Sequence, residues 1–183
     1  MPTVLAFLRA INVGGRFLKM ADLASHFSSL GLTNVTTYIN SGNVLFESRA
    51  TRLDRLGANI ERDLEPLLGF KSEVFLRRSE EVHAVAAQAT EHRAVLPEQG
   101  EVNVAFLSSP LNLGQSTALA ALKTDLDDFA HTGREIYWLC RGNQMESKFS
   151  NVVLERRLKL RTTFRRVSML TKLSEQLRTS GEA

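Results

Sequence analysis

Short apolar runs alternate along the chain with longer segments in which apolar residues recur every three or four positions. The run from Thr3 to Arg9 is apolar and is followed by Gly14-Gly15, which is typical of a buried strand. From residue 20 to 30 one helical face is predicted, and Gly31 suits the position after its end. The apolar residues of that face are Met20, Leu23, Phe27 and Leu30.

The same two patterns continue to residue 76. Strand-like runs at 35–39 and 44–46 flank Asn40-Ser41-Gly42-Asn43, and asparagine and glycine tolerate the positive φ of a hairpin turn. A second helical face follows, Gly69 ends it, and residues 73–76 form another strand. Its apolar residues are Leu53, Leu56, Ile60, Leu64 and Leu68. The order β, α, β, β, α, β is that of a ferredoxin-like unit.

After a helix at 80–89 and a linker at 94–100, this order returns. The predicted elements are a strand at 102–107, a helix marked by Leu119, Leu122 and Leu126, a hairpin of strands 129–131 and 136–140, a helix at 152–158, a strand at 161–164 and a last helix marked by Leu170, Leu173 and Leu177. The sequence therefore predicts an α+β protein of two tandem ferredoxin-like (βαββαβ) units. The first spans 1–78, residues 79–100 connect, and the second spans 101–183 with an extra C-terminal helix.

Composition agrees with a globular protein, since 43% of the 183 residues are hydrophobic and 23% are charged. Cys140 is the only cysteine, so no intramolecular disulfide forms, and its apolar run predicts a buried structural thiol. The N-terminal residues lack the pattern of a signal peptide, and no run of about 18 apolar residues is present. We expect a soluble, cytoplasmic protein without a membrane partner.

Several common chemistries find no support in the sequence. The four histidines do not lie at metal-binding spacing, and the single cysteine has no partner, so no metal site is predicted. The nucleophile elbow, the phosphate loop and the dinucleotide glycine fingerprint are all missing. We predict no cofactor and name no catalytic residue, and whether the protein is an enzyme stays open.

Two polar turns in the first half are candidates for ligand binding. In the segment 9–16, Arg9 supplies positive charge, and Asn12, Gly14 and Gly15 allow the backbone to approach a phosphate or carboxylate closely. In the first hairpin, the side chains of Asn40, Ser41 and Asn43 can read a polar ligand. Both segments also suit ordinary turns without a ligand, and that interpretation stays open.

A third candidate is the segment from Glu146 to Val152. Ser147 or Ser150 suits the N-cap of the helix that follows. Lys148 then lies near the positive end of the helix dipole, where a cation is disfavoured unless an anion binds there. The surrounding third of the chain is basic, with nine basic and two acidic residues from Arg141 to Lys172. This charge suits an anionic partner, but it equally describes a solvated basic surface.

Six short motifs make the chain resemble the uncharacterised bacterial domain-of-unknown-function family 1697. They are Arg9–Gly15, Lys19–Leu23, Tyr38–Phe46, Val104–Leu107, Ser147–Phe149 and Thr162-Thr163. Two departures are Ala10, where the family has glycine, and residues 164–167, which replace a different family stretch. The resemblance implies a fold of two ferredoxin-like units and brings no activity, cofactor or catalytic residue.

Three functions remain in competition. The leading hypothesis is binding of a small anionic or phosphorylated ligand at Arg9, Asn12, Gly14, Gly15, Asn40, Ser41, Asn43 and Lys148. The second is RNA binding through the basic C-terminal third, although neither predicted central strand carries the aromatic motif of an RNA-recognition sheet. The third is a protein–protein interaction module. The oligomeric state stays unknown.

Overall fold

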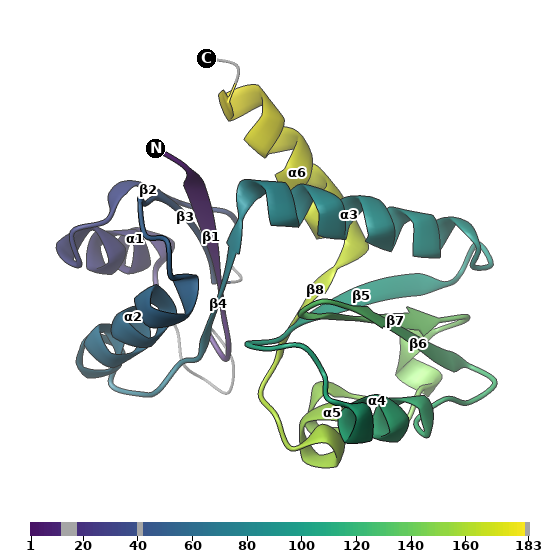
Figure 1. Ribbon diagram of the computed structural model, residues 1–183. Helices are drawn as coiled ribbons and strands as arrows, with labels where there is room; N and C mark the ends of the chain where they lie inside the picture. The colour runs from purple at the N-terminus through teal and green to yellow at the C-terminus, as the bar shows by residue number, and fades with distance from the viewer. Residues whose placement is uncertain (12–17, 40–41, 182–183) are drawn as a thin grey trace. The chain divides into compact units, whose positions relative to one another are not determined.

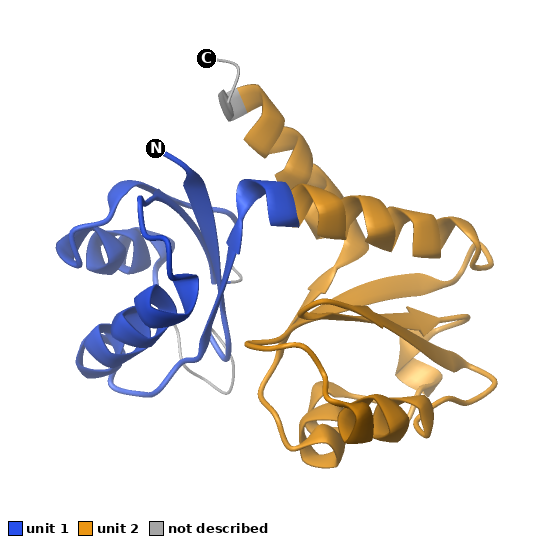
Figure 2. Cartoon of the chain, viewed as in Figure 1, with its two compact units in different colours: residues 1–81 blue, residues 82–183 orange. Residues whose placement is uncertain are grey.

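The computed structural model describes residues 1–11, 18–39 and 42–181 (Figure 1). By its internal contacts the chain divides into two compact units, residues 1–81 and 82–183 (Figure 2). Each unit contains one four-stranded antiparallel sheet and the helices that pack on it. The predicted α+β fold of two ferredoxin-like units is therefore confirmed.

The first unit contains four strands and two helices in the order β, α, β, β, α, β. They are β1 (Thr3–Leu8), α1 (Met20–Ser29), β2 (Thr33–Thr37), β3 (Asn43–Glu47), α2 (Leu53–Leu68) and β4 (Val74–Arg78). The strands lie in the order β2-β3-β1-β4, so the two central strands come from the first and third positions in the chain. This is the strand order of a ferredoxin-like sheet.

The core of the first unit lies between one face of its sheet and the two helices. Val4, Ala6 and Leu8 of β1 alternate along that face, as the two-residue period of a strand requires. Phe27 of α1 and Leu64 of α2 pack against them and are fully buried. The apolar spacing that predicted the two helices is thus the spacing that fills this core.

The first hairpin requires glycine at position 42. Gly42 has a φ of +68°, and a Cβ atom there would lie 3.1 Å from the side chain of Ile11 and 3.3 Å from that of Leu8. The predicted strand before the turn ends too late, because β2 stops at Thr37 and Ile39 has a φ of +50°. A positive φ is incompatible with continued strand pairing, so the chain leaves the sheet before Ile39.

The second unit repeats the element order of the first. It contains β5 (Glu101–Phe106), α4 (Leu113–Ala120), β6 (Asp127–Thr132), β7 (Glu135–Cys140), a short 3-10 helix η1 (Gln144–Glu146), α5 (Asn151–Leu158), β8 (Thr163–Arg166) and α6 (Val167–Gly181). Its strand order, β6-β7-β5-β8, corresponds position by position to that of the first sheet.

The second sheet carries helices on both faces (Figure 1). On one face, Trp138 and Ile136 of β7 pack with Leu119 of α4 and Leu154 of α5. On the other lie α6 and α3 (Ser79–Ala94), and the hydroxyl of Tyr137 donates a 3.0 Å hydrogen bond to Gln88 of α3. Helix α3 follows β4 directly, as α6 follows β8, so a helix after the fourth strand belongs to both repeats.

Several predicted boundaries in the second unit are wrong, since β6 begins two residues before the predicted Phe129 and α3 ends five residues after the predicted Ala89. Helix α4 ends at Ala120, so Leu122 and Leu126 lie in the turn after it. The Thr124 hydroxyl accepts hydrogen bonds from the backbone N–H groups of Leu126 and Asp127, which stabilises this turn in place of another helical turn. Strand β8 begins at Thr163, two residues later than the predicted start at Arg161.

In the part of the chain that the structure describes, no helix has both the length and the apolar character needed to cross a membrane.

Candidate functional site

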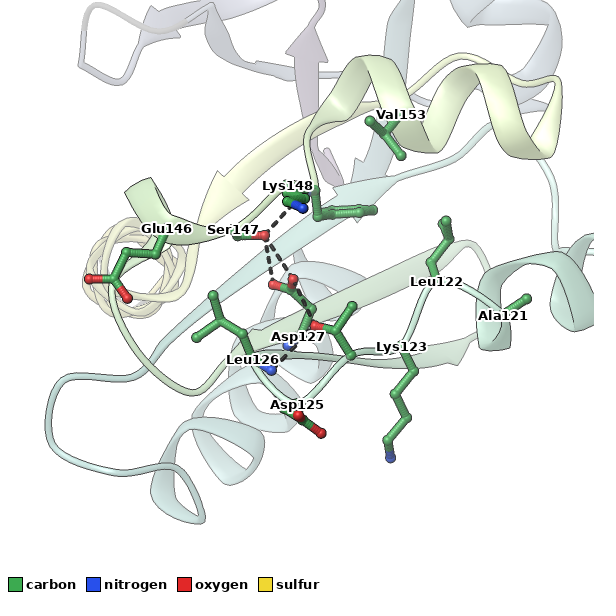
Figure 3. A pocket seen from close by; sticks show the side chains of 12 residues that line it. Ala121, Leu122, Lys123, Asp125, Leu126, Asp127, Glu146, Ser147, Lys148 and Val153 are labelled. Carbon is green, nitrogen blue, oxygen red and sulfur yellow. Dashed lines mark hydrogen bonds between the residues drawn. The ribbon is translucent and has the colours of Figure 1, made fainter.

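A cavity of about 520 Å³ lies in the second unit, beside the turn after α4 and the connection between η1 and α5 (Figure 3). Its walls come from residues 121–127, 146–149 and 153. The turn after α4 therefore forms one side of the cavity. The segment from Glu146 to Val152, which the sequence analysis named as a candidate, contributes the other side.

Asp127, at the start of β6, is the buried polar centre of this cavity. Its side chain is 2% exposed, and its carboxylate accepts hydrogen bonds from three donors. The indole Nε1 of Trp138 donates at 2.7 Å, the Ser147 hydroxyl lies 2.8 and 2.9 Å from the two oxygens, and the Thr124 hydroxyl donates at 3.2 Å. A buried carboxylate is tolerated when its oxygens are satisfied in this way.

The same hydroxyls hold the backbone on both sides of the cavity. Thr124 accepts from the N–H groups of Leu126 and Asp127, and Ser147 accepts from the N–H of Phe149 at 2.9 Å. Because Thr124 and Ser147 both bind Asp127, the turn after α4 and the η1–α5 connection are joined through one carboxylate. Asp127 is therefore a structural anchor of the site.

Phe149 is the aromatic residue that lines the cavity, and an aromatic cluster behind it holds its ring in place. Phe149 is 8% exposed, and its ring centroid lies 4.8 Å from that of Trp138 and 4.7 Å from that of Phe129, both tilted. Such tilted pairs are favourable ring arrangements. The remaining apolar lining comes from Ala121, Leu122, Leu126 and Val153. The wall can accept a ring or an aliphatic group of a ligand.

The charged groups around the cavity differ in whether they have partners. Lys123 forms a 2.6 Å ion pair with Asp128. Lys148 is exposed and forms no hydrogen bond or ion pair within the described ranges 1–11, 18–39 and 42–181. Figure 3 shows the side chains of Asp125 and Glu146 extending away from Asp127. Lys148 is therefore the lining cation whose charge is left for a ligand.

Burial and hydrogen bonding act in opposite directions on Asp128. Partial burial raises the pKa of its carboxyl group, but the hydrogen bonds from Lys123 and from the Phe129 N–H, with the charges of Lys123 and Arg141, hold the pKa below its usual value. Asp128 is therefore ionised at neutral pH and compensates the charge of Lys123.

Cys140 is fully buried beside this site, as the sequence predicts, and its thiol donates to the carbonyl of Gly142 at 3.4 Å. Burial raises the pKa of the thiol, with smaller contributions from nearby carboxylates, and the hydrogen bond to Gly142 offsets only part of this rise. Cys140 is thus a buried thiol whose thiolate form is disfavoured.

The structure describes three of the eight predicted site residues. Lys148 lines the cavity of the second unit, whereas Arg9 and Asn43 belong to the first. Arg9 lies 3.5 Å from Glu73 in an ion pair, and its backbone N–H bonds to the Glu73 carbonyl. Asn43 is 1% exposed, and its amide donates to the carbonyl of Tyr38, which holds the hairpin. The other five lie outside the described residues, and they are Asn12, Gly14, Gly15, Asn40 and Ser41.

The sequence analysis placed Ser147 and Ser150 correctly near the start of α5. It did not identify Asp127, the buried acid to which Ser147 donates a hydrogen bond. Ser150 is the N-cap of α5 and accepts from the N–H of Val153 at 3.3 Å, so Ser147 is available for Asp127. Asp127 carries no local motif, because its partners Trp138 and Ser147 lie 11 and 20 residues away. The threonine three residues before it is the only nearby signal.

Comparison with known proteins supports the fold but assigns no function. The solved structure of a conserved bacterial protein, SP0830 from Streptococcus pneumoniae, is similar to this chain with a TM-score of 0.74 and 24% identity, over 97% of this chain and 99% of that one. At this identity the likeness shows the fold alone. No curated protein matches the chain. A family model described as protein of unknown function (DUF1697) matches residues 1–137.

Proposed function

The chain belongs to the DUF1697 family of proteins of unknown function, and we propose that it binds a small ligand carrying a phosphate or carboxylate group in the cavity beside Lys148. The observation that carries the proposal is an exposed ammonium group, unpaired among the described residues, on the wall of a preformed cavity. The anionic group of the ligand would bind Lys148, and its apolar part would lie against Phe149.

The size and lining of the cavity support a small molecule. Its volume of about 520 Å³ falls within the roughly 300–1,000 Å³ of small-molecule sites. Such sites combine apolar walls with a few placed polar groups, which here are the wall formed by Phe149 and its aliphatic neighbours and the ammonium group of Lys148. The hydrogen bonds of Asp127 hold both sides of the cavity in place, so little ordering is needed when a ligand enters.

The pairing of the charged groups, rather than the total charge of the lining, supports an anionic group at Lys148, since the carboxylates of Asp125 and Glu146 also line the cavity but extend away from Asp127. Lys123 is compensated by Asp128, and the carboxylate of Asp127 is occupied by its donors. Lys148 lies two residues before Ser150, the N-cap of α5. The positive end of a helix dipole disfavours a cation there and favours an anion, so a bound anion would relieve the unfavourable position of Lys148.

The predicted contribution of the first unit remains a separate hypothesis. Arg9 is engaged by Glu73 and Asn43 by Tyr38, while Asn12, Gly14 and Asn40 lie outside the described residues. The proposal therefore rests on the second unit alone. It concerns binding and assigns no reaction.

The single tryptophan, Trp138, offers a direct test because it contacts both Phe149 and Asp127. Its fluorescence would be titrated with inorganic phosphate, sugar phosphates and small carboxylates, with thermal shift as a second readout for nucleotides. For the ligand that binds, we expect Lys148→Ala to raise Kd about tenfold, the lower range for an exposed charge-assisted contact. Lys148→Arg keeps the positive charge and should raise Kd by a smaller factor.

The matched control is Lys172→Ala. Lys172 is also an exposed lysine of the second unit, but it lies on α6, which packs on the opposite face of the sheet. It should leave Kd unchanged. If every probe leaves Trp138 and the thermal midpoint unaffected, or if the two lysine variants lose binding equally, the proposed site is wrong.

A further inference from the structure

A second concave surface lies at the C-terminal end of α5 and does not share residues with the cavity at Lys148. This groove has a volume of about 460 Å³, and three of its six lining residues are basic. The lining residues are Val152, Glu155, Arg156, Lys159, Leu160 and Arg161. Of the nine basic residues between Arg141 and Lys172, these three are brought to one groove.

The only acid of the groove is already engaged. Glu155 is 7% exposed, and its Oε1 accepts from the N–H of Thr162 at 2.9 Å. Its Oε2 lies 3.2 Å from Nη1 of Arg161, in an ion pair whose arginine side chain remains 62% exposed. Glu155 therefore holds Arg161 at the groove while more than half of the arginine side chain stays exposed.

Lys159 occupies a backbone conformation that does not favour a lysine. It is the C-cap of α5, with φ 54° and ψ 47°, in the left-handed region where glycine is the usual residue. A residue with a Cβ atom is disfavoured relative to glycine in this conformation. The lysine is thus not explained by the stability of the cap.

The helix dipole explains part of the positive charge at the end of α5, and this provides a control residue for the test. Cations near the C-terminal end of a helix are favoured by its dipole, and this applies to both Arg156 and Arg157 in the last turn of α5. Only Arg156 lines the groove, although both are exposed and neither has an ion pair within the described ranges. The dipole therefore accounts for the charge of the helix end but not for the convergence of Arg156, Lys159 and Arg161.

We propose that this groove binds phosphate groups, with Arg156, Lys159 and Arg161 as their ligands. Three cations against one engaged carboxylate leave a net charge of +2, which suits a phosphate dianion or two adjacent phosphates. Guanidinium groups match phosphate oxygens with paired N–H donors. The phosphates come from a small phosphorylated molecule or from the backbone of RNA, and the two sources share this chemistry. The groove is independent of the site at Lys148.

The test uses the full-length protein and two probes, inorganic pyrophosphate and a fluorescein-labelled 12-nucleotide RNA. Binding would be measured by calorimetry and by fluorescence anisotropy for wild type, Arg156→Ala, Lys159→Gly and the control Arg157→Ala. We expect about a tenfold higher Kd for the two groove variants. The control should stay within twofold. Lys159→Gly removes the charge while keeping the cap conformation, so its loss of binding cannot come from unfolding.

The pattern of losses decides both the site and the source. Pyrophosphate binding that needs Arg156 and Lys159 supports a small phosphorylated ligand. RNA binding with the same dependence and a steep fall with salt supports a nucleic-acid backbone. Equal loss in Arg157→Ala would overturn the site in favour of diffuse surface charge, and so would the absence of binding by both probes. Lys148→Ala should leave groove binding unchanged, so failure at one site is distinguishable from failure at the other.

Discussion

Substitution of Asp127 by alanine tests whether one buried carboxylate holds the candidate site together. The change removes the acceptor of the Trp138 indole N–H and of the Ser147 and Thr124 hydroxyls. The two hydroxyls can turn towards water in the cavity that opens. The indole N–H is held in the aromatic cluster and has no second acceptor in the part of the chain that the structure describes.

The magnitude follows from these contacts. A buried donor left without an acceptor costs about 1–3 kcal/mol, and a hydrogen bond to a charged group contributes about 1.5–3 kcal/mol. With the hydroxyls largely rehydrated, we expect Asp127→Ala to lower the free energy of unfolding by about 3 kcal/mol. For a chain of 183 residues this corresponds to a fall of roughly 6–12 °C in Tm. Asp127→Asn keeps one acceptor oxygen and should lose about half as much.

The assay is urea unfolding followed by far-ultraviolet circular dichroism, with Trp138 fluorescence as a local probe. Asp125→Ala is the matched control, because Asp125 is an exposed carboxylate two residues away that accepts no side-chain hydrogen bond in the described residues. It should change stability by less than about 0.5 kcal/mol. If Asp127→Ala is no more destabilising than this control, the carboxylate does not anchor the site.

Two further substitutions test the hairpin and the ion pair. Gly42→Ala should destabilise the protein by about 1–3 kcal/mol in urea unfolding, because the new Cβ meets Ile11 at 3.1 Å and φ is +68°; a neutral effect would contradict the close approach. The folded pKa of Asp128 lies below its unfolded value, so its contribution to stability is complete above about pH 4, the unfolded pKa, and falls as pH drops through the folded pKa. Unfolding measured from pH 2 to 6 should show a shallower acid loss in Lys123→Ala than in wild type, and parallel profiles would refute this cause.

Local patterning predicted the elements that bury one continuous face. Apolar residues recur at helical spacing from Leu53 to Leu68. Helix α2 spans that range, and Gly69 is its C-cap in the left-handed conformation. The strands around Gly133 likewise form the predicted hairpin, with φ +56° at that glycine. Patterning failed where a side chain redirected the backbone. Thr124 binds N–H groups after α4, so the apolar Leu122 and Leu126 pack on the core from a turn.

The candidate site was predicted only in part, for a related reason. Lys148 was identifiable because its position before a helix is unfavourable for a cation, and this is a local property of the sequence. Asp127 was not identifiable, because its importance comes from Trp138 and Ser147. The segment from Arg141 to Lys172 has a net charge of +7, but this charge alone did not predict which of its residues form a binding surface. Arg165 from that segment is buried, which lowers its pKa to about 10, whereas Arg156, Lys159 and Arg161 line one groove.

The sequence by itself determined the element order, the two repeated units and the presence of a hairpin in each unit. These depend on the period of apolar residues and on backbone freedom at glycine and asparagine, which act over a few neighbouring residues. Only the tertiary structure decided which polar groups meet. Strand pairing brought Asp127 opposite Cys140 and within reach of Trp138, and the η1–α5 connection returned Ser147 to the same carboxylate. Hydrogen bonds and ion pairs need short distances in space, but they can join residues at any separation along the chain. The partners of such a site are therefore known only once the chain has folded.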